Sequence, residues 1–189
     1  MECVILAAGF SRRMGQWKPL LPYQQGCILD AAIKNAQQYC RQILLVVGYR
    51  AEELRAKYGD QENILIIENP HFAQGMFSSI QCAMPYIQGE HFFITLGDMP
   101  CIAPSVYHTL LANAGSQREI IFPGNAQQTG HPVLFPRAAI TAISQAPTNS
   151  KMKSLLSPYF HFRFLNLATQ QGILLDVDTP ADYVQLTSC

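Results

Sequence analysis

Short apolar runs alternate along the first 111 residues with segments in which apolar side chains recur every three or four positions. Continuous apolar runs are typical of strands that are buried on both faces, and the second pattern is typical of helices with one buried face. The predicted strands cover residues 3–7, 43–47, 64–67 and 92–96. The predicted helices cover residues 28–40, 54–58, 76–87 and 104–111. This alternation predicts an α/β fold with a mainly parallel sheet and helices on both faces.

The second half of the chain has a less regular pattern, which predicts further strands at 120–122, 133–135, 160–164 and 173–175. Thr179, Pro180 and Asp182 form a start signal for a last helix, because they suit its N-cap, first and third positions. No repeat or linker interrupts the sequence. We therefore expect a single domain over residues 1–189 whose mixed sheet is completed by the C-terminal half.

Composition narrows the range of functions. The 189 residues carry 13 Lys+Arg and 13 Asp+Glu, so the formal net charge is zero. A general nucleic-acid binder or a polybasic membrane-surface protein needs a clear excess of cations. No apolar run reaches the roughly 20 residues of a membrane span, and the first residues do not have the layout of a signal peptide. We expect a cytoplasmic protein that binds neither nucleic acid nor membranes.

The loop after the first strand concentrates the candidate chemistry. It reads Leu6-Ala-Ala-Gly-Phe-Ser-Arg-Arg-Met-Gly-Gln-Trp-Lys18. Its small residues allow backbone N–H groups to approach an anion, and Arg12, Arg13 and Lys18 place three cations within seven positions. The spacing fits neither the Walker loop nor the dinucleotide fingerprint. A polyphosphate site is favoured over a merely solvated turn.

The same loop strongly resembles the signature of the MobA-like nucleotidyltransferases, and its Ala8 is typical of the molybdenum cofactor cytidylyltransferase branch, since the guanylyltransferase branch usually has glycine there. Four further segments resemble the family's motifs in the same order. They are Asn69-Pro70 with Gln74-Gly-Met-Phe-Ser-Ser79, Leu96-Gly-Asp-Met-Pro100, Gly130-His-Pro-Val-Leu-Phe135 and Asp176-Val-Asp-Thr-Pro180.

The resemblance implies a three-layer, Rossmann-like fold of the GT-A type and a Mg²⁺-dependent transfer of CMP from CTP to the phosphate of molybdopterin, with release of pyrophosphate. Two other readings stay open for the reaction, a GTP donor or a sugar or polyol phosphate acceptor. A third reading is a carrier that holds the cofactor for a molybdoenzyme, but a carrier needs neither Lys18 nor Asp98. A molybdoenzyme client is a possible partner in either case.

By the same resemblance, Lys18, Arg13 and Asp98 are the catalytic residues. Residues 7–13 would wrap the β- and γ-phosphates, and Lys18 would stabilise the charge that develops on the α-phosphate. The implied nucleotide-binding residues are Leu6, Ala7, Ala8, Gly9, Ser11, Arg12, Arg13, Lys18, Gln74, Gly75, Ser78 and Ser79. Ser78 and Ser79 could instead be ordinary residues of a first helical turn, and the methyl group of Ala8 could exclude a larger purine base.

Mg²⁺ favours one or two carboxylates together with phosphate oxygens and water. Asp98 follows a predicted strand and is its natural first ligand. We expect only one of Asp176 and Asp178 to share the side of Asp98, and the resemblance favours Asp178 as the second ligand. Asp178 could instead serve only to start the last helix.

His131, Lys151 and Lys153 are tentative contacts of the acceptor. His131 lies in the segment that faces the second substrate in the family, although it could simply pack in a turn. The family commonly carries Gly-Asp-x-Gly-Ala-Arg after this strand, whereas this chain has Thr148-Asn-Ser-Lys-Met-Lys153. The two lysines could still meet a phosphate, but this departure makes the pterin contacts less certain than the nucleotide contacts.

Overall fold

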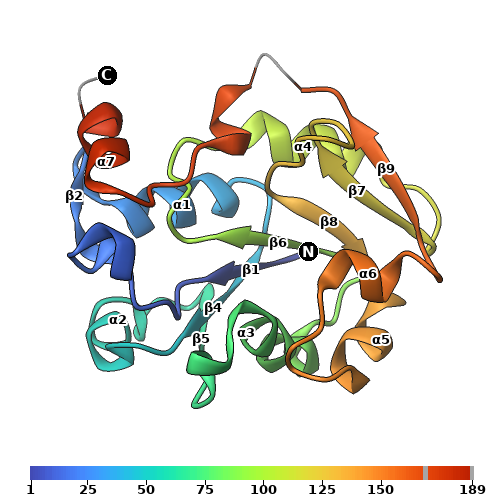
Figure 1. Cartoon of the computed structure of the whole chain (residues 1–189), viewed down its shortest axis with the longest axis horizontal. Helices are drawn as coiled ribbons and strands as arrows, with labels where there is room; N and C mark the ends of the chain where they lie inside the picture. Colours follow the sequence, from blue (N-terminus) through green and yellow to red (C-terminus); the bar gives the residue numbers. More distant parts are fainter. Residues whose placement is uncertain (168–169, 188–189) are drawn as a thin grey trace.

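A mixed sheet crosses the centre of the molecule in the computed structural model, which describes residues 1–167 and 170–187 (Figure 1). Within these residues its seven strands lie in the spatial order β5 (Ile64–Glu68), β4 (Gln42–Val47), β1 (Glu2–Leu6), β6 (His91–Leu96), β8 (Val133–Pro136), β7 (Glu119–Pro123) and β9 (His161–Leu165). The first four are parallel, β8 is antiparallel to both of its neighbours, and β9 is parallel to β7. The predicted α/β architecture with a mixed, mainly parallel sheet is confirmed.

Helices cover both faces of this sheet. They are α1 (Ile28–Gln37), α2 (Ala51–Tyr58), α3 (Met76–Ala83), α4 (Pro104–Ala112), α5 (Ala139–Gln145), α6 (Met152–Leu156) and α7 (Pro180–Thr187). Figure 1 shows α1 and α4 on one side and α3 and α5 on the other. Alternate residues of β1 serve the two layers, since Cys3 and Ile5 pack with the α1 side and Val4 packs with the α3 side. None of the described helices is long and apolar enough to cross a membrane.

The cysteines of the described chain are free thiols. Cys3, Cys27 and Cys40 are buried, and Cys82 and Cys101 are partly buried. They pack as small side chains in and around the core.

Two predicted elements differ from the structure. The predicted strand 173–175 is wrong, because residues Gln171–Leu174 form a 3-10 turn in which the N–H of Ile173 donates to the carbonyl of Gln170. Gly172 lies so close to the carbonyl of Cys101 that a Cβ would stand 1.9 Å from that oxygen, which leaves no room for a strand neighbour. The predicted helix 76–87 ends early, because Pro85 has no N–H to donate and the chain continues as a 3-10 turn.

A short hairpin was not predicted. Strands β2 (Pro22–Tyr23) and β3 (Gly26–Cys27) form it just before α1, outside the main sheet. Its turn contains Gln24 at φ 51°, a backbone region usually taken by glycine or asparagine, so that the usual sequence signal for such a turn is missing. Figure 1 shows α7 beside this hairpin.

Candidate active site

The loop after β1 is shaped by its own hydrogen bonds. The N–H of Ala7 still donates to the carbonyl of Val46, so the loop begins at the carboxyl edge of the parallel strands. Ser11 then takes φ 54°, and its hydroxyl accepts the backbone N–H of Lys18 at 3.2 Å. This bond closes the loop and places Lys18 at the first position of a 3-10 turn, Lys18–Leu20.

Lys18 joins two carboxylates that are far apart in the sequence. Its ammonium group lies 2.5 Å from Asp98 Oδ2 and 2.9 Å from Asp178 Oδ1. Arg13 pairs with the other oxygen of Asp178 at 2.5 Å. The Lys18 side chain is only 11% exposed, whereas that of Arg13 is 74% exposed. The structure therefore brings together the three predicted catalytic residues and the predicted second metal ligand.

The charges in this cluster stabilise one another. Burial alone would lower the pKa of Lys18, but the charge of Asp98 and hydrogen bonds to both carboxylates outweigh it and raise that pKa. Burial likewise favours the neutral form of Asp178, yet Lys18 and then Arg13 hold the pKa of Asp178 below its ordinary value. The Lys18 ammonium group therefore lies between two carboxyl groups, and its positive charge favours the ionised form of Asp178.

Asp176 lies near the same cluster without an ion pair of its own among the described contacts. Burial raises its pKa, and repulsion from the charge of Asp178 raises it further. Asp178 is the one of the two that contacts Lys18. Asp182 also reaches this segment, since its carboxylate accepts the backbone N–H groups of Asp178 and Thr179.

The carboxylates fit a divalent cation. Among the described residues, the buried Oδ1 of Asp98 has no hydrogen-bond partner and can accept a cation. No group of three or more His, Cys, Asp or Glu side chains in the described chain forms a complete metal site. Two carboxylates without further protein ligands suit an ion that takes its other oxygens from phosphate and water.

A cavity of about 450 Å³ opens beside Asp98, within the size range of ligand pockets. Most of the residues predicted to bind the nucleotide line it. They are Leu6, Ala7, Ala8, Gly9, Ser11, Arg12, Lys18, Gly75 and Ser79. A Cβ on Gly9 would meet no heavy atom of its surroundings within 4 Å, so the backbone there is open to a ligand. Arg12 lies over the ring of Phe10, with 4.6 Å between its guanidinium carbon and the ring centre.

The segment before α3 forms the opposite wall. Gly75 takes φ 112°, which strongly favours glycine, and the chain turns there into the helix. Ser78 is buried and donates to the carbonyl of Gly75 at 2.8 Å, so its hydroxyl is occupied by the protein. Gln74 and Ser78 are not among the described residues that line the cavity.

None of the three tentative acceptor residues is among the described residues that line the nucleotide cavity, although the charges of Asp98 and Asp176 act on His131. Burial lowers the pKa of His131, and its Nδ1 lies 3.4 Å from the carbonyl oxygen of Ile94. Lys153 donates to the hydroxyl of Thr129 and lies over the ring of Phe122. Lys151 is exposed. The structure does not bring these three side chains together with the carboxylates in a shared hydrogen-bond or ion-pair network among the described contacts.

Sequence reasoning missed several residues of the cavity wall. Phe10, Phe72, Ala73 and Met76 line it, and the rings of Phe10 and Phe72 stand 5.0 Å apart. Aromatic residues inside two predicted loops were a signal that could have identified Phe10 and Phe72, because loop aromatics often form binding surfaces.

Comparisons with known proteins agree with this geometry. Residues 3–163 match the family described as the MobA-like NTP transferase domain. The chain is similar to the molybdenum cofactor cytidylyltransferase of Escherichia coli strain K12, with 42% identity over 188 residues that cover 97% of this chain and 94% of the relative.

Solved structures show the same fold. Rv0371c of Mycobacterium tuberculosis H37Rv has a TM-score of 0.82 and 27% identity, with 100% of this chain and 97% of that chain covered. A manganese complex of Rv0371c is similar at a TM-score of 0.78 and 25% identity, with the same coverage. A nucleotidyl transferase from Methanothermobacter thermautotroptrophicus has a TM-score of 0.84 at 18% identity, over 99% of this chain and 95% of that chain.

Proposed function

Because the chain belongs to the MobA-like NTP transferase family, we propose that it transfers CMP from CTP to the terminal phosphate of molybdopterin. The relative from Escherichia coli, which is named for this cytidylyl transfer, supports the proposal through 42% identity over nearly the whole of both chains. The observation that carries it is the ion cluster of Lys18, Arg13, Asp98 and Asp178 beside the cavity.

The reaction joins two anions. An oxygen of the acceptor phosphate attacks the α-phosphorus of CTP, and the bond from that phosphorus to the oxygen bridging to the β-phosphorus breaks. That oxygen leaves with both electrons as part of pyrophosphate. Positioning and neutralisation of charge are therefore the main tasks of the protein.

The side chains of this site suit both tasks. The loop after β1 offers backbone N–H groups and the guanidinium group of Arg12 for the β- and γ-phosphates, whereas Arg13 does not line the cavity and pairs with Asp178. Lys18, held at the cavity wall, neutralises charge on the α-phosphate as the bond to the leaving oxygen breaks. Asp98 and Asp178 would hold Mg²⁺, which supplies a divalent charge next to the phosphate oxygens when it is bound.

Ala8 supports cytosine as the base. It is only 6% exposed and lines the cavity, and its methyl group fills space that a glycine would leave open to a larger base. Magnesium with CTP should therefore raise the melting temperature more than magnesium with GTP, because stabilisation follows ligand affinity. Equal shifts with both nucleotides would contradict cytidine as the donor base.

Two substitutions test the chemistry. Lys18→Ala removes the cation at the α-phosphate, and Asp98→Asn removes a metal ligand, so each should lower the rate of pyrophosphate release by about a hundredfold or more. The matched controls Lys34→Ala and Asp60→Asn change exposed residues of the same types outside the cavity and should retain full turnover. Circular dichroism would establish that each variant is folded. Turnover at the wild-type rate in Lys18→Ala or Asp98→Asn would exclude this mechanism.

A further inference from the structure

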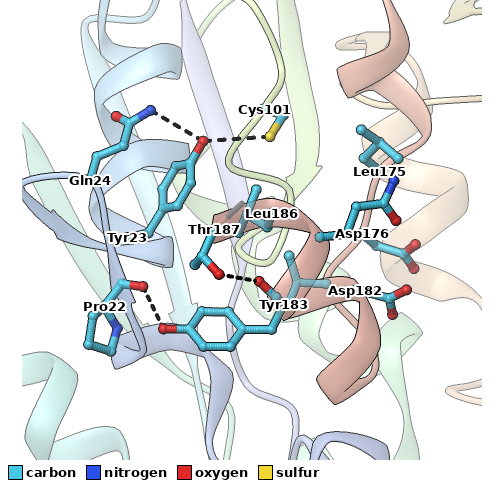
Figure 2. Close-up of a pocket in the computed structure, with 12 residues that line it drawn as sticks. Pro22, Tyr23, Gln24, Cys101, Leu175, Asp176, Asp182, Tyr183, Leu186 and Thr187 are labelled. Carbon is cyan, nitrogen blue, oxygen red and sulfur yellow. Dashed lines mark hydrogen bonds between the residues drawn. The ribbon is translucent and has the colours of Figure 1, made fainter. Parts of the chain in front are cut away.

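A second cavity, of about 810 Å³, lies between the β2–β3 hairpin and α7 (Figure 2). It shares no lining residue with the nucleotide cavity among the described residues. Its volume lies in the range of pockets that hold small molecules. None of the residues predicted to bind the nucleotide or the acceptor lines it, so the proposed reaction leaves this space unassigned.

About half of the residues that line this cavity are aromatic or aliphatic. Figure 2 shows Tyr23 of the hairpin and Tyr183 and Leu186 of α7 around it, with Leu175 on the far side. Leu175 is 45% exposed, although it is a large apolar residue. The hydroxyl of Tyr183 donates to the carbonyl of Pro22 at 2.7 Å, which joins α7 to the hairpin and keeps the two walls together.

The other lining residues are largely polar and include two carboxylates: Gln24, Asp176, Asp182, Gln185 and Thr187. The Tyr23 hydroxyl accepts a hydrogen bond from the Gln24 amide at 3.2 Å and lies 3.7 Å from the sulfur of Cys101. Apolar surface combined with polar groups is typical of sites for flat, heteroatom-containing rings, because the faces bury apolar surface and the edges need hydrogen bonds.

The same cavity borders the carboxylate cluster. Asp176 and Val177 line it, and they directly precede Asp178, which contacts Lys18. The N–H of Val177 donates to the carbonyl of Asp98 at 3.0 Å, so this segment is fixed against the loop that carries the other carboxylate. A ligand that fills the cavity thus has one end next to the reacting groups.

We propose that this second cavity holds the ring system of the acceptor, a flat fused heterocycle of the pterin type, while the acceptor phosphate extends past Asp176 toward Lys18. The inference rests on the proposed function, which requires an acceptor bound beside the nucleotide. His131 and Lys153 are alternative contacts for the ring. However, His131 packs against the carbonyl of Ile94. Lys153 donates a hydrogen bond to Thr129 and lies over the ring of Phe122.

A matched pair of substitutions tests this assignment. Leu175→Trp would narrow the cavity, whereas Leu174→Trp makes the same change at the preceding residue, which is 36% exposed and does not line the cavity. Steady-state pyrophosphate release would be measured with molybdopterin and CTP varied in turn. Leu175→Trp should raise the KM for molybdopterin by about tenfold or more, and the KM for CTP should stay within about twofold of the wild type. Leu174→Trp should change neither constant.

Free pterin serves as a probe of the ring alone. It should inhibit the wild type and Leu174→Trp competitively against molybdopterin, and it should inhibit Leu175→Trp about tenfold more weakly. Because free pterin lacks the phosphate, this loss would locate the effect at the ring and not at the ion cluster.

The outcomes separate the two proposals. A wild type that binds CTP but forms no cytidylylated molybdopterin contradicts the proposed function and the ring site with it. A wild type that forms this product, together with an unchanged KM for molybdopterin in Leu175→Trp, contradicts the ring site alone and leaves the cavity as a surface for another molecule. Equal effects of both tryptophans, or a raised KM for CTP in Leu175→Trp, also contradict the ring site.

Discussion

Lys18 contacts two carboxylates that a nucleotide-bound metal ion would also need. With its side chain 11% exposed and its ammonium group within 3 Å of Asp98 and Asp178, it supplies the positive charge between these two side chains. A divalent cation at the same carboxylates would perform that task and release Lys18 toward a phosphate. The lysine and the metal are in this sense alternative counter-ions of one pair of carboxylates.

Lys18→Ala should therefore make the stability of the protein depend on metal. In the presence of EDTA, the free energy of unfolding should fall by about 1–3 kcal/mol, because two partly buried carboxylates lose their shared cation. Millimolar Mg²⁺ should then raise the melting temperature of Lys18→Ala more than that of the wild type, since only the variant lacks the competing ammonium group. Thermal melts with and without Mg²⁺ would measure both effects.

The double variant Lys18→Ala/Asp178→Asn is the control, because it has lost the second carboxylate as well as the lysine. Its melting temperature should respond to Mg²⁺ less than that of Lys18→Ala. If Mg²⁺ shifts the wild type and Lys18→Ala by the same amount, the lysine and the metal do not compete for these carboxylates.

At this scale the charged residues were identified by the resemblance of their motifs to the family, and the structure brings Lys18 and Asp98 together from positions 80 residues apart. Motifs do not indicate which hydroxyl or imidazole group hydrogen-bonds within the protein. Ser78 is taken up by Gly75 and Asn69, and this depends on the exact turn between them.

The turn between β5 and α3 is held by one buried asparagine. The Asn69 amide donates to the hydroxyls of Ser78 and Ser79 at 2.9 and 3.0 Å, and its oxygen accepts the N–H of His71. Asn69 is 0% exposed, so these hydrogen bonds are shielded from bulk solvent. We expect these hydrogen bonds of Asn69 to hold Gly75 and Ser79 in position at the cavity wall.

Asn69→Ala should lower the free energy of unfolding by about 2–4 kcal/mol, because it leaves buried donors and acceptors without partners. It should also weaken the binding of CTP, since the wall formed by residues 72–79 loses its support. Urea unfolding and a CTP titration would measure the two effects. Asn63→Ala, which changes an exposed asparagine before β5, should alter neither. If Asn69→Ala is destabilised but binds CTP with unchanged affinity, the hydrogen bonds of Asn69 stabilise the fold without contributing to nucleotide binding.

Elements with a strong apolar pattern could be predicted from the sequence, and elements defined by single backbone contacts could not. The strands of the parallel half are continuous apolar runs, and the start of α7 follows its capping signal, with Thr179 and Asp182 bonded to each other. The turn at 171–174 has an apolar pattern like that of a strand, yet the approach of Gly172 to Cys101 decides its conformation. Such an approach depends on the packing of two residues that are 71 positions apart in the sequence.

For the molecule as a whole, the segment 176–178 connects two cavities, because Asp176 and Val177 line one of them and Asp178 contacts Lys18, which lines the other. The cavity lined by Lys18 contains the signature loop and the start of α3, and the other lies between the hairpin and α7. The α/β class with its mainly parallel sheet could be inferred from the apolar pattern, and the family could be inferred from five motifs in the same order along the chain, whereas the spatial order of the strands was not predicted. The second cavity could not be inferred, since it depends on the unpredicted hairpin and on α7 packing against it through Tyr183.

The central claim is that the edge of the sheet holds a triphosphate and a divalent ion together, and one crystallographic measurement tests it most directly. Crystals grown with CTP and Mn²⁺ would be measured for the anomalous signal of manganese. The account predicts a peak bound by Asp98 and Asp178, with the triphosphate along residues 7–13 and Lys18 turned to the α-phosphate. A triphosphate bound elsewhere, or a manganese peak away from Asp98 with Lys18 still paired to both carboxylates, would contradict it.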